Sequence, residues 1–294
     1  MTDQSLTAAA GAPGPSAVIQ PPQLTPPRIS LLSSADVVTD SGTRWENGYT
    51  YSPEGCGEGA VGALCPNAGD TKTFCLNPSI VEFVPFFVYS SDKCSAFSFK
   101  ERDYFGRATR KLLAAESWFL ENELMLDTLA LNNHPIISPA ATVVSAGALP
   151  PLTALSAVED ALGDCSRGGR YMIHVRPGVF VALAGSQSIR REGNVWLTPL
   201  DNIVVPGRGY PGTGPTGQAI GTSEWIYATS MVQIRRGPVL LTPEQGEQTK
   251  DNPQGIPTSA VDRGVNDIMV IAERIVSAAY DPSCCVIAAE VSRS

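Results

Sequence analysis

The residues of this sequence that could do chemistry are few, and their spacing fits none of the standard catalytic motifs. The chain has two histidines: His134 stands before a proline, and His174 stands between an isoleucine and a valine. Neither belongs to an H-E-x-x-H zinc motif, and no serine lies in a G-x-S-x-G turn. A histidine within an apolar run is usually a structural residue with hydrogen-bonded ring nitrogens. The sequence therefore predicts no catalytic residue, no metal site and no cofactor.

Three glutamates, Glu116, Glu121 and Glu123, lie close together in a long helical pattern and would be the next candidates for a carboxylate site. On an amphipathic helix, such a cluster usually forms the solvated face. We therefore expect these side chains to be exposed. Replacing Glu121 with alanine should then lower the free energy of unfolding by less than about 0.5 kcal/mol.

Cysteine thiols are the remaining nucleophiles. The chain has seven cysteines, Cys56, Cys65, Cys75, Cys94, Cys165, Cys284 and Cys285. None of their intervals matches the short C-x2-4-C pairs of a zinc site. An odd number in a chain without a secretion signal favours reduced, mostly buried structural thiols. A cysteine-dependent hydrolase that uses Cys165 or Cys94 remains as an alternative, although its sequence signatures are missing.

A glycine-rich segment at 206–221 contains six glycines and three prolines. Such a loop could hold a phosphate, but it lacks the Lys-Ser/Thr pair of a P-loop and does not open a helix after a strand. We expect tight turns at a contact between subunits. Its one charged residue, Arg208, would pair with a carboxylate or carbonyl of a neighbour, and Tyr210 is a second candidate for this contact.

Composition limits the function classes further. The chain has 294 residues, 43% of them hydrophobic and 17% charged, with a net charge of -8 and a pI near 4.9. This acidic balance disfavours a protein that grips duplex DNA. No run approaches the length of a membrane span, and the N-terminus does not resemble a signal peptide. We expect a protein with a substantial core that is made and kept in the cytoplasm.

The elements that must position these residues alternate between strands and helices. The clearest is a long helix over 100–131, in which Phe105, Leu112, Phe119 and Leu124 should face a sheet. Further segments show strand or helix patterns. We expect strands at 80–89 (split at Pro85), 170–175, 179–183, 224–234 and 284–291, and helices at 152–169 and 265–279.

The N-terminal quarter of the chain is expected to be extended. Residues 1–43 contain six prolines and should form an arm that adds nothing to the fold of the monomer. Residues 44–75 contain six glycines and should form a long loop or hairpin. Its aromatic residues Trp45, Tyr49 and Tyr51 are candidates for contacts between subunits.

This order of parts resembles the major capsid protein of tailed bacteriophages, a fold also used by encapsulin shells. Five stretches are similar to capsid proteins of actinobacterial phages: RWENGYTYSPEGC (44–56), a DKCS turn (92–95) before the long helix, VVPGRGYPGTGP (204–215), WIYATSMVQI (225–234) and AERIVSAAYDPSCCVIAAEV (272–291). The resemblance implies an α+β fold in several parts. These are an N-terminal arm at 1–43, an extended loop at 44–75, a peripheral domain at 76–147 and 223–294 with a spine helix at 100–131, and an axial domain at 148–222.

The same resemblance implies a structural function without enzymatic activity. The chain would form hexamers and pentamers of an icosahedral phage head that encloses double-stranded DNA without sequence-specific binding. It would be a virion protein that assembles in the host cytoplasm, with separate scaffolding, portal and decoration proteins as partners. Some family members cross-link through a loop lysine, but we interpret Lys72 as a solvated residue. The alternatives are an encapsulin-type shell that stores cargo and a virion protein outside the shell.

Overall fold

The structure is a computed structural model that describes residues 22–54, 80–95, 103–130, 136–166, 168–246, 255–256, 261–262 and 267–293. His134, Lys72 and the cysteines at 56, 65 and 75 lie outside these ranges. The described helices are α2 (Leu31–Ser34), η1 (Arg44–Asn47), α3 (Tyr104–Leu126), α4 (Ile137–Ala140), α5 (Pro151–Ser166) and α6 (Pro177–Gly185). The strands are β1 (Asp36–Thr39), β2 (Tyr49–Tyr51), β3 (Val81–Phe83), β4 (Phe86–Ser95), β5 (Thr142–Val143), β6 (Met172–Val175), β7 (Arg190–Glu192), β8 (Val195–Leu197), β9 (Ile203–Pro206), β10 (Ser223–Thr229), β11 (Gln233–Arg236), β12 (Leu240–Thr242), β13 (Val261–Asp262), β14 (Asp267–Ala279) and β15 (Ile287–Ser292).

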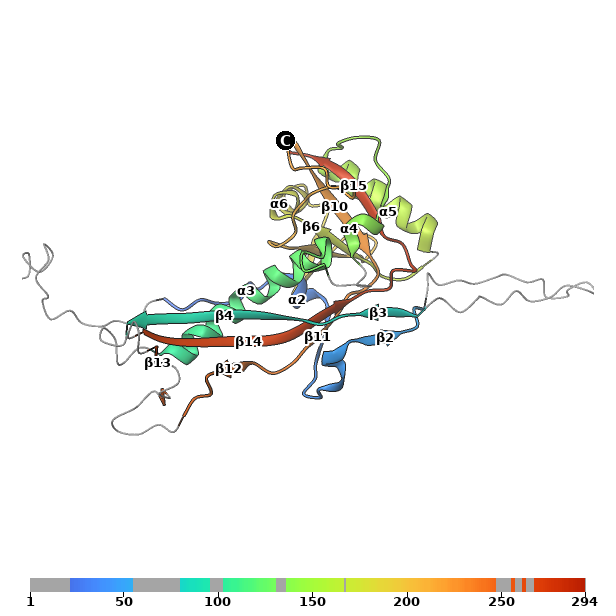
Figure 1. Ribbon diagram of the computed structural model, residues 1–294. Coiled ribbons are helices and arrows are strands. Elements are labelled where there is room, and N and C mark those ends of the chain that lie inside the picture. Colours follow the sequence, from blue (N-terminus) through green and yellow to red (C-terminus); the bar gives the residue numbers. More distant parts are fainter. Residues whose placement is uncertain are drawn as a thin grey trace, which may run out of the picture.

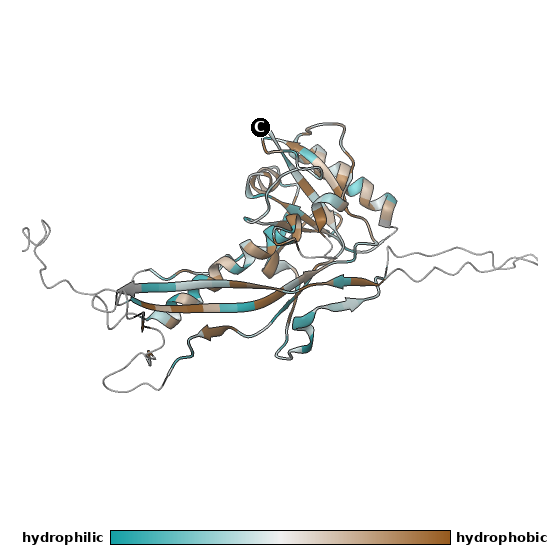
Figure 2. Cartoon of the chain, viewed as in Figure 1, coloured by the Kyte–Doolittle hydropathy of each residue, from teal (hydrophilic) through white to brown (hydrophobic). Residues whose placement is uncertain are grey.

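A six-stranded sheet forms the long, flat part of the molecule in Figure 1. Its order is β1-β11-β14-β12, and β4 and β13 also pair with β14. The antiparallel register of β4 and β14 runs from the Asp267 and Ser95 pair to the Val276 and Phe86 pair. Figure 2 shows the hydropathy of these two strands. As expected, the strand at 80–89 divides at Pro85, which has no N–H for a ladder hydrogen bond.

The segment that we expected to be a helix at 265–279 is the longest strand, β14. Its first residues alternate in burial: Ile268, Val270 and Ala272 are buried. This period of two is typical of a strand with one buried face. A short apolar run in the sequence, by itself, is compatible with either a helix or a strand. The expected helix is therefore wrong, because pairing along β4 determines the conformation.

A second sheet of seven strands has the order β5-β15-β10-β6-β9-β8-β7. Helices α5 and α6 cover one of its faces with a cluster of buried residues that includes Leu155 and Val158 of α5 and Val179 and Leu183 of α6. The expected helix at 152–169 is confirmed as α5. The expected strand at 179–183 is wrong, because Pro177 opens a helix after the extended residue Arg176.

The expected strand at 224–234 consists of two strands in different sheets. β10 pairs with β15 and β6 in the seven-stranded sheet, whereas β11 pairs with β1 and β14 in the six-stranded sheet. The chain changes sheets at Ser230, whose hydroxyl accepts the Asp281 N–H at 2.8 Å. The peripheral domain that the resemblance implies at 223–294 therefore includes strands of both sheets.

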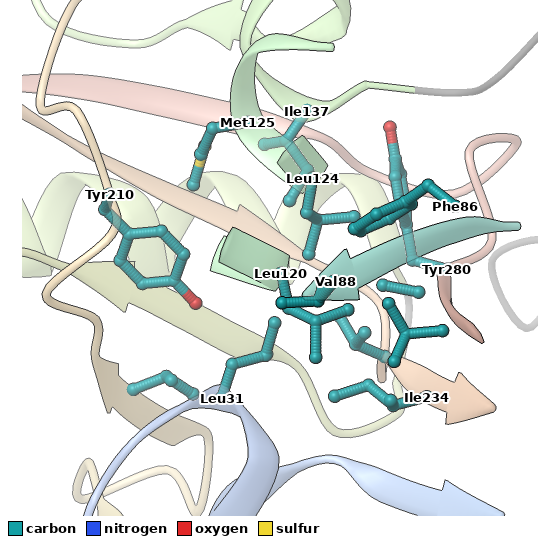
Figure 3. Close-up of a cluster of buried hydrophobic side chains, with 14 of the residues drawn as sticks. Leu31, Phe86, Val88, Leu120, Leu124, Met125, Ile137, Tyr210, Ile234 and Tyr280 are labelled. Atoms are coloured by element: carbon teal, nitrogen blue, oxygen red, sulfur yellow. The ribbon is translucent and has the colours of Figure 1, made fainter. Parts of the chain in front are cut away.

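Helix α3 connects the two sheets, and it is shorter than the expected 100–131. Asp103 caps its N-terminus by accepting the Gly106 N–H at 2.8 Å, and Asp127 ends it in the left-handed conformation. Phe105, Leu112 and Leu124 are buried as expected. Figure 3 shows Leu120 and Leu124 of this helix beside Leu31, Val88 and Ile234 in the core.

Phe119 is 42% exposed, so its expected contact with the sheet is wrong. In its first half, α3 buries residues such as Phe105 and Ala108 against β4 and β14. In its second half the buried side includes Ser117, Leu120 and Glu121, because this half also packs against α2 and α4. The buried face therefore rotates along the helix.

This assignment of faces can be tested with two substitutions on α3. Leu112→Ala should lower the free energy of unfolding by about 2 to 5 kcal/mol, because a fully buried side chain leaves a cavity. Phe119→Ala should lower it by less than about 1 kcal/mol, because much of this ring is already in solvent. Urea unfolding of unassembled subunits followed by circular dichroism measures both. Equal losses would mean that the faces are assigned incorrectly.

Part of the N-terminal segment belongs to the monomer core. Leu31 is fully buried, and β1 pairs in parallel with β11 from the Asp36 and Gln233 pair to the Thr39 and Arg236 pair. The expectation that residues 1–43 add nothing to the fold is therefore wrong for this stretch. The prolines end at Pro27, and the apolar residues that follow are able to join a core.

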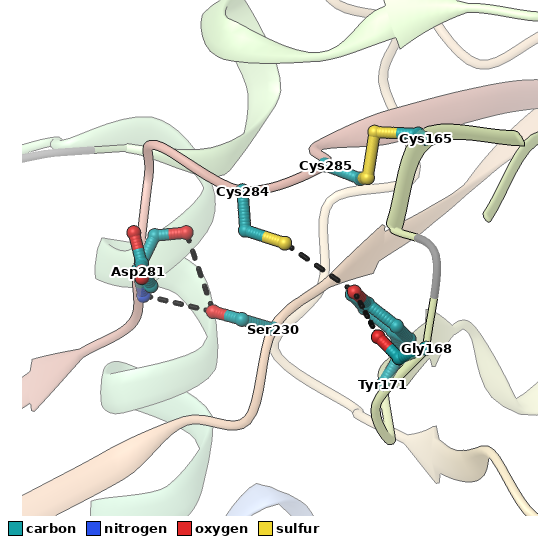
Figure 4. Close-up of a disulfide and its surroundings, with 7 residues drawn as sticks. All are labelled: Cys165, Gly168, Tyr171, Ser230, Asp281, Cys284 and Cys285. Atoms are coloured by element: carbon teal, nitrogen blue, oxygen red, sulfur yellow. Dashed lines mark hydrogen bonds between the residues drawn. A yellow bond between two sulfur atoms is a disulfide. The ribbon is translucent and has the colours of Figure 1, made fainter. Parts of the chain in front are cut away.

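Two of the cysteines are joined in a disulfide, which the expectation of reduced thiols did not include. Cys165 at the end of α5 is bonded to Cys285, with a Cα–Cα distance of 6.0 Å (Figure 4). The neighbouring Cys284 sulfur lies 3.3 Å from the Tyr171 hydroxyl. The bonded residues are 120 positions apart in the sequence, so no local spacing indicates the pair. The bond leaves no free thiol at Cys165 for the hydrolase alternative.

Candidate assembly site

A short two-stranded ribbon flanks the segment that we expected to be an extended loop. β2 and β3 pair in antiparallel register from Tyr49 with Phe83 to Tyr51 with Val81. The Phe83 ring is fully buried and stacks against both tyrosines, with ring centroids 6.0 Å from Tyr49 and 5.4 Å from Tyr51. The ribbon therefore fixes both ends of the intervening segment, of which the structure describes only the first and last residues.

Hydrogen bonds tie this ribbon to the end of β14. The Tyr51 hydroxyl donates to the Tyr280 carbonyl, and the Tyr49 hydroxyl lies 3.3 Å from the Ser277 hydroxyl. The Arg235 guanidinium lies over the Tyr49 ring at 5.3 Å from its centroid. Burial raises the pKa of both Tyr49 and Tyr51, so both phenols stay protonated and able to donate. The two tyrosines, which are half-buried, thus hold the base of the loop within one chain.

The second group of candidate residues lies where the glycine-rich loop crosses α3, and Glu121 is at its centre. This glutamate is 1% exposed. Its Oε1 accepts the Leu31 N–H at 3.1 Å and the Ser117 hydroxyl at 2.8 Å, and its Oε2 accepts the Gly209 N–H at 2.8 Å. Burial raises the pKa of the Glu121 carboxyl, and these hydrogen bonds partly oppose that effect. One side chain therefore joins the N-terminal segment, the long helix and the loop.

The other two glutamates of α3 are also buried, so the expectation of a solvated acidic face is wrong. Glu116 accepts from the Arg274 guanidinium at 2.9 Å. Glu123 accepts the backbone N–H groups of Thr128 and Leu129, each at 3.1 Å, at the end of the helix. Each carboxylate is satisfied by different donors, as buried charges require. The three do not form a shared carboxylate site.

The expected subunit-contact loop at 206–221 lies partly inside the monomer. Its first half is mostly buried between α3 and the seven-stranded sheet, and Tyr210 is only 3% exposed. Gly209 contacts α3 so closely that a Cβ atom there would lie 2.1 Å from the Trp118 carbonyl oxygen. Close packing against α3 therefore requires glycine at this position.

Tyr210 belongs to a buried hydrogen-bonded chain with His174. The His174 Nδ1 lies 2.7 Å from the Tyr210 hydroxyl, and its Nε2 lies 2.9 Å from the Thr229 hydroxyl. The Thr229 hydroxyl donates to the Ser230 carbonyl, so it accepts from Nε2–H, and Nδ1 accepts from Tyr210. Burial lowers the pKa of His174 to about 3. This is the satisfied structural histidine that the sequence predicts.

The buried histidine predicts a specific pH dependence. In the unfolded chain, His174 takes up a proton below its ordinary pKa near 6.5, whereas in the fold it stays neutral down to about 3. Stability is therefore lost as the pH falls through this window, by about 2 kcal/mol between pH 7 and pH 5. Urea unfolding at several pH values, compared with His174→Gln, isolates this contribution because the carboxylates titrate in both proteins. Identical pH profiles would contradict the assignment.

The five residues proposed as subunit contacts therefore lie in two separate places. Trp45 and Tyr210 are buried within the monomer and have almost no surface to offer, whereas Tyr49 and Tyr51 are half-buried. Arg208 is exposed and makes no ion pair with any residue that the structure describes. Sequence reasoning missed Leu31 and the structural role of Glu121, because a leucine after prolines and a glutamate in a helix carry no distinctive pattern.

The described residues show neither a metal site nor a membrane segment. Among them, no three side chains of His, Cys, Asp or Glu type come together as metal ligands. In the same part of the chain, every helix is too short or too polar to span a bilayer.

Comparison with solved structures identifies the fold. The capsid of Ralstonia phage GP4 is 11% identical, with a TM-score of 0.55 and 97% of each chain covered. A structure from Mycobacterium phage Cain is 10% identical, with a TM-score of 0.54 and 98% of each chain covered. The holo-SrpI encapsulin complex from Synechococcus elongatus is 11% identical, with a TM-score of 0.54, covering 99% of this chain and 96% of that one.

These likenesses extend over almost the entire chain and show that it has the major capsid fold of tailed phages and encapsulins. The fold implied by the sequence resemblance is therefore confirmed. By sequence, the chain matches no protein-family model and no curated protein. The likeness is thus visible in the arrangement of the sheets and the long helix.

Proposed function

We propose that this protein is the structural subunit of an icosahedral phage head, which assembles into hexamers and pentamers around double-stranded DNA. The observation that carries the proposal is the match to a phage capsid over 97% of both chains. A match of that extent includes both sheets and the long helix, and not a single common motif.

The surface of the monomer supports assembly. Within the described part of the chain, α3 covers one face of the six-stranded sheet, and large apolar side chains are exposed on the other face. Phe87 and Tyr89 on β4 are 62% and 61% exposed, and Met269 on the adjoining β14 is 43% exposed. Large apolar side chains exposed on one face of a sheet are typical of interaction sites in soluble proteins. We propose that neighbouring subunits cover this face in the shell.

The acidic composition is more typical of a shell protein than of a DNA-binding protein. A net charge of -8 gives little attraction for phosphates, so enclosed DNA would be held without sequence-specific contacts. We propose a virion protein without enzymatic activity that assembles in the host cytoplasm with separate scaffolding, portal and decoration proteins.

A cargo-storing shell is a second candidate, favoured by the likeness to the holo-SrpI encapsulin. Both candidates predict closed particles from the same subunit. They differ in content, because a phage head encloses DNA, whereas a storage shell encloses a protein.

Sedimentation of the expressed full chain, with and without co-expressed scaffolding candidates, tests the proposal. We expect particles far larger than a dimer. A matched variant replaces residues 52–80 with an Asn-Gly turn, which preserves the Tyr49 and Phe83 pair. This variant should keep its melting transition and fail to form particles. Monomers or dimers of the parent protein under every condition would contradict the proposal.

A further inference from the structure

The second half of α3 is inverted relative to an ordinary surface helix. All three charged side chains between residues 113 and 126 point inward: Glu116, Glu121 and Glu123 are at most 3% exposed. In contrast, Trp118 is 44% exposed and Phe119 is 42% exposed. A soluble helix normally places its charges in water and its aromatic rings in the core. This inversion indicates that the outer face of α3 is covered by a partner.

The exposed residues follow a helical spacing. Half-buried Ala115 is followed by Trp118 and Phe119, then by half-buried Asn122 and by Leu126, which is 37% exposed. Positions three to four residues apart lie on one side of a helix, so these five residues form a continuous ridge. We name them the α3 ridge. A ridge of this form packs best against the grooves of another helix.

The aromatic residues at the centre of the ridge suit a binding site. The Trp118 and Phe119 rings contact each other edge to face, with centroids 5.0 Å apart. Aromatic side chains of this kind contribute a large share of the affinity at protein interfaces.

A positive charge beside the ridge indicates which net charge a partner helix should carry. Arg208 precedes Gly209, which contacts the Trp118 backbone, so the Arg208 backbone lies beside α3 and its exposed side chain starts from there. It has no ion-pair partner within the described part of the chain. The exposed positions of α3 from 113 to 126 carry no carboxylate, because all three are buried. The surface therefore combines an apolar ridge with one unneutralised cation, which complements an acidic partner.

We propose that the α3 ridge and Arg208 bind an acidic amphipathic helix supplied by another polypeptide. In a second copy, α5 and α6 bury Leu155, Val158, Val179 and Leu183 against their own sheet. The sequence predicted that Arg208 pairs with a carboxylate or carbonyl of a neighbouring subunit. In this proposal, the bound helix supplies the carboxylate instead. The inference names a partner beyond the shell itself and does not depend on shell formation.

Two designed peptides of three heptads test the proposal. One has leucine on a single face and glutamate and glutamine elsewhere, and the other has lysine in place of each glutamate. Fluorescence anisotropy measures the binding of each peptide to the full chain. The protein is kept unassembled at low concentration, and light scattering checks that it stays so. We expect the glutamate peptide to bind at least about tenfold more tightly than the lysine peptide.

Variants assign the binding to the ridge. The double substitution Trp118→Ala and Phe119→Ala should lower the affinity for the glutamate peptide at least about tenfold, because these two rings lie at the centre of the proposed binding site. Arg208→Gln should remove most of the difference between the two peptides. Leu200→Ala is the matched control, because Leu200 is 68% exposed and lies in the β8–β9 connection, and it should change neither affinity. Melting curves confirm that each variant is folded.

A photo-cross-linking group in place of Asn122 gives a second measurement that does not depend on variant stability. We expect covalent capture of the glutamate peptide. The proposal is overturned if neither peptide binds, if both bind equally, or if the double variant binds as the parent does. Cross-links between two copies of the chain, without capture of the peptide, would instead identify a second copy as the occupant. Peptide binding without particles would leave this inference standing and contradict the proposed shell.

Discussion

Replacing Glu121 with alanine is expected to lower the free energy of unfolding by about 3 to 5 kcal/mol. The substitution removes the acceptor for the Leu31 N–H, the Gly209 N–H and the Ser117 hydroxyl at once. These donors would remain buried without partners, and a net stability of about 5 to 15 kcal/mol tolerates such a loss poorly. Urea unfolding of unassembled subunits measures the effect.

Two further variants show whether the loss comes from the lost hydrogen bonds. Glu121→Gln keeps the side-chain volume and one acceptor oxygen, so its loss should lie between those of the parent and the alanine variant. Glu192→Ala removes an exposed glutamate on β7 and should change stability by less than about 0.5 kcal/mol. If Glu121→Ala and Glu192→Ala have equal effects, Glu121 is not the junction that we describe.

The second large effect is expected at Gly209. A methyl group there would lie 2.1 Å from the Trp118 carbonyl oxygen and 2.9 Å from the Glu121 Cβ. The oxygen belongs to the helix backbone and cannot move without disturbing α3. Gly209→Ala should therefore lower the free energy of unfolding by about 3 kcal/mol, at the upper end of overpacking substitutions.

Gly163 provides the matched control for this substitution. It lies within α5, and a Cβ atom there would meet nothing within 4 Å. Gly163→Ala should therefore leave the protein unchanged or stabilise it by up to about 1 kcal/mol. Thermal melting compares the two variants directly. A Gly209→Ala protein as stable as the parent would contradict the close contact between loop and helix.

The fold could be predicted from the sequence where a local pattern determines the structure. The break at Pro85, the helix α5 and the strand β6 follow from proline chemistry and hydrophobic periodicity. The strand β14 could not be predicted, because its apolar run is compatible with either a helix or a strand, and only pairing with β4 decides between them. Similarly, the division of 224–234 between two sheets is decided by tertiary pairing.

The candidate site was less predictable, because its residues gain their roles from distant partners. Glu121 contacts Leu31, 90 positions earlier, and Gly209, 88 positions later, and neither separation leaves a pattern in one sequence. The same holds for Cys165 and Cys285. In contrast, the inward histidine could be predicted, since His174 stands within an apolar strand.

Cryo-electron microscopy of the purified full chain tests the central claim most directly. The account predicts closed icosahedral particles with five-fold and six-fold clusters of subunits, in which a neighbouring subunit covers Phe87 and Tyr89. Images that show only single subunits or small open oligomers, with and without a scaffolding partner, would contradict it.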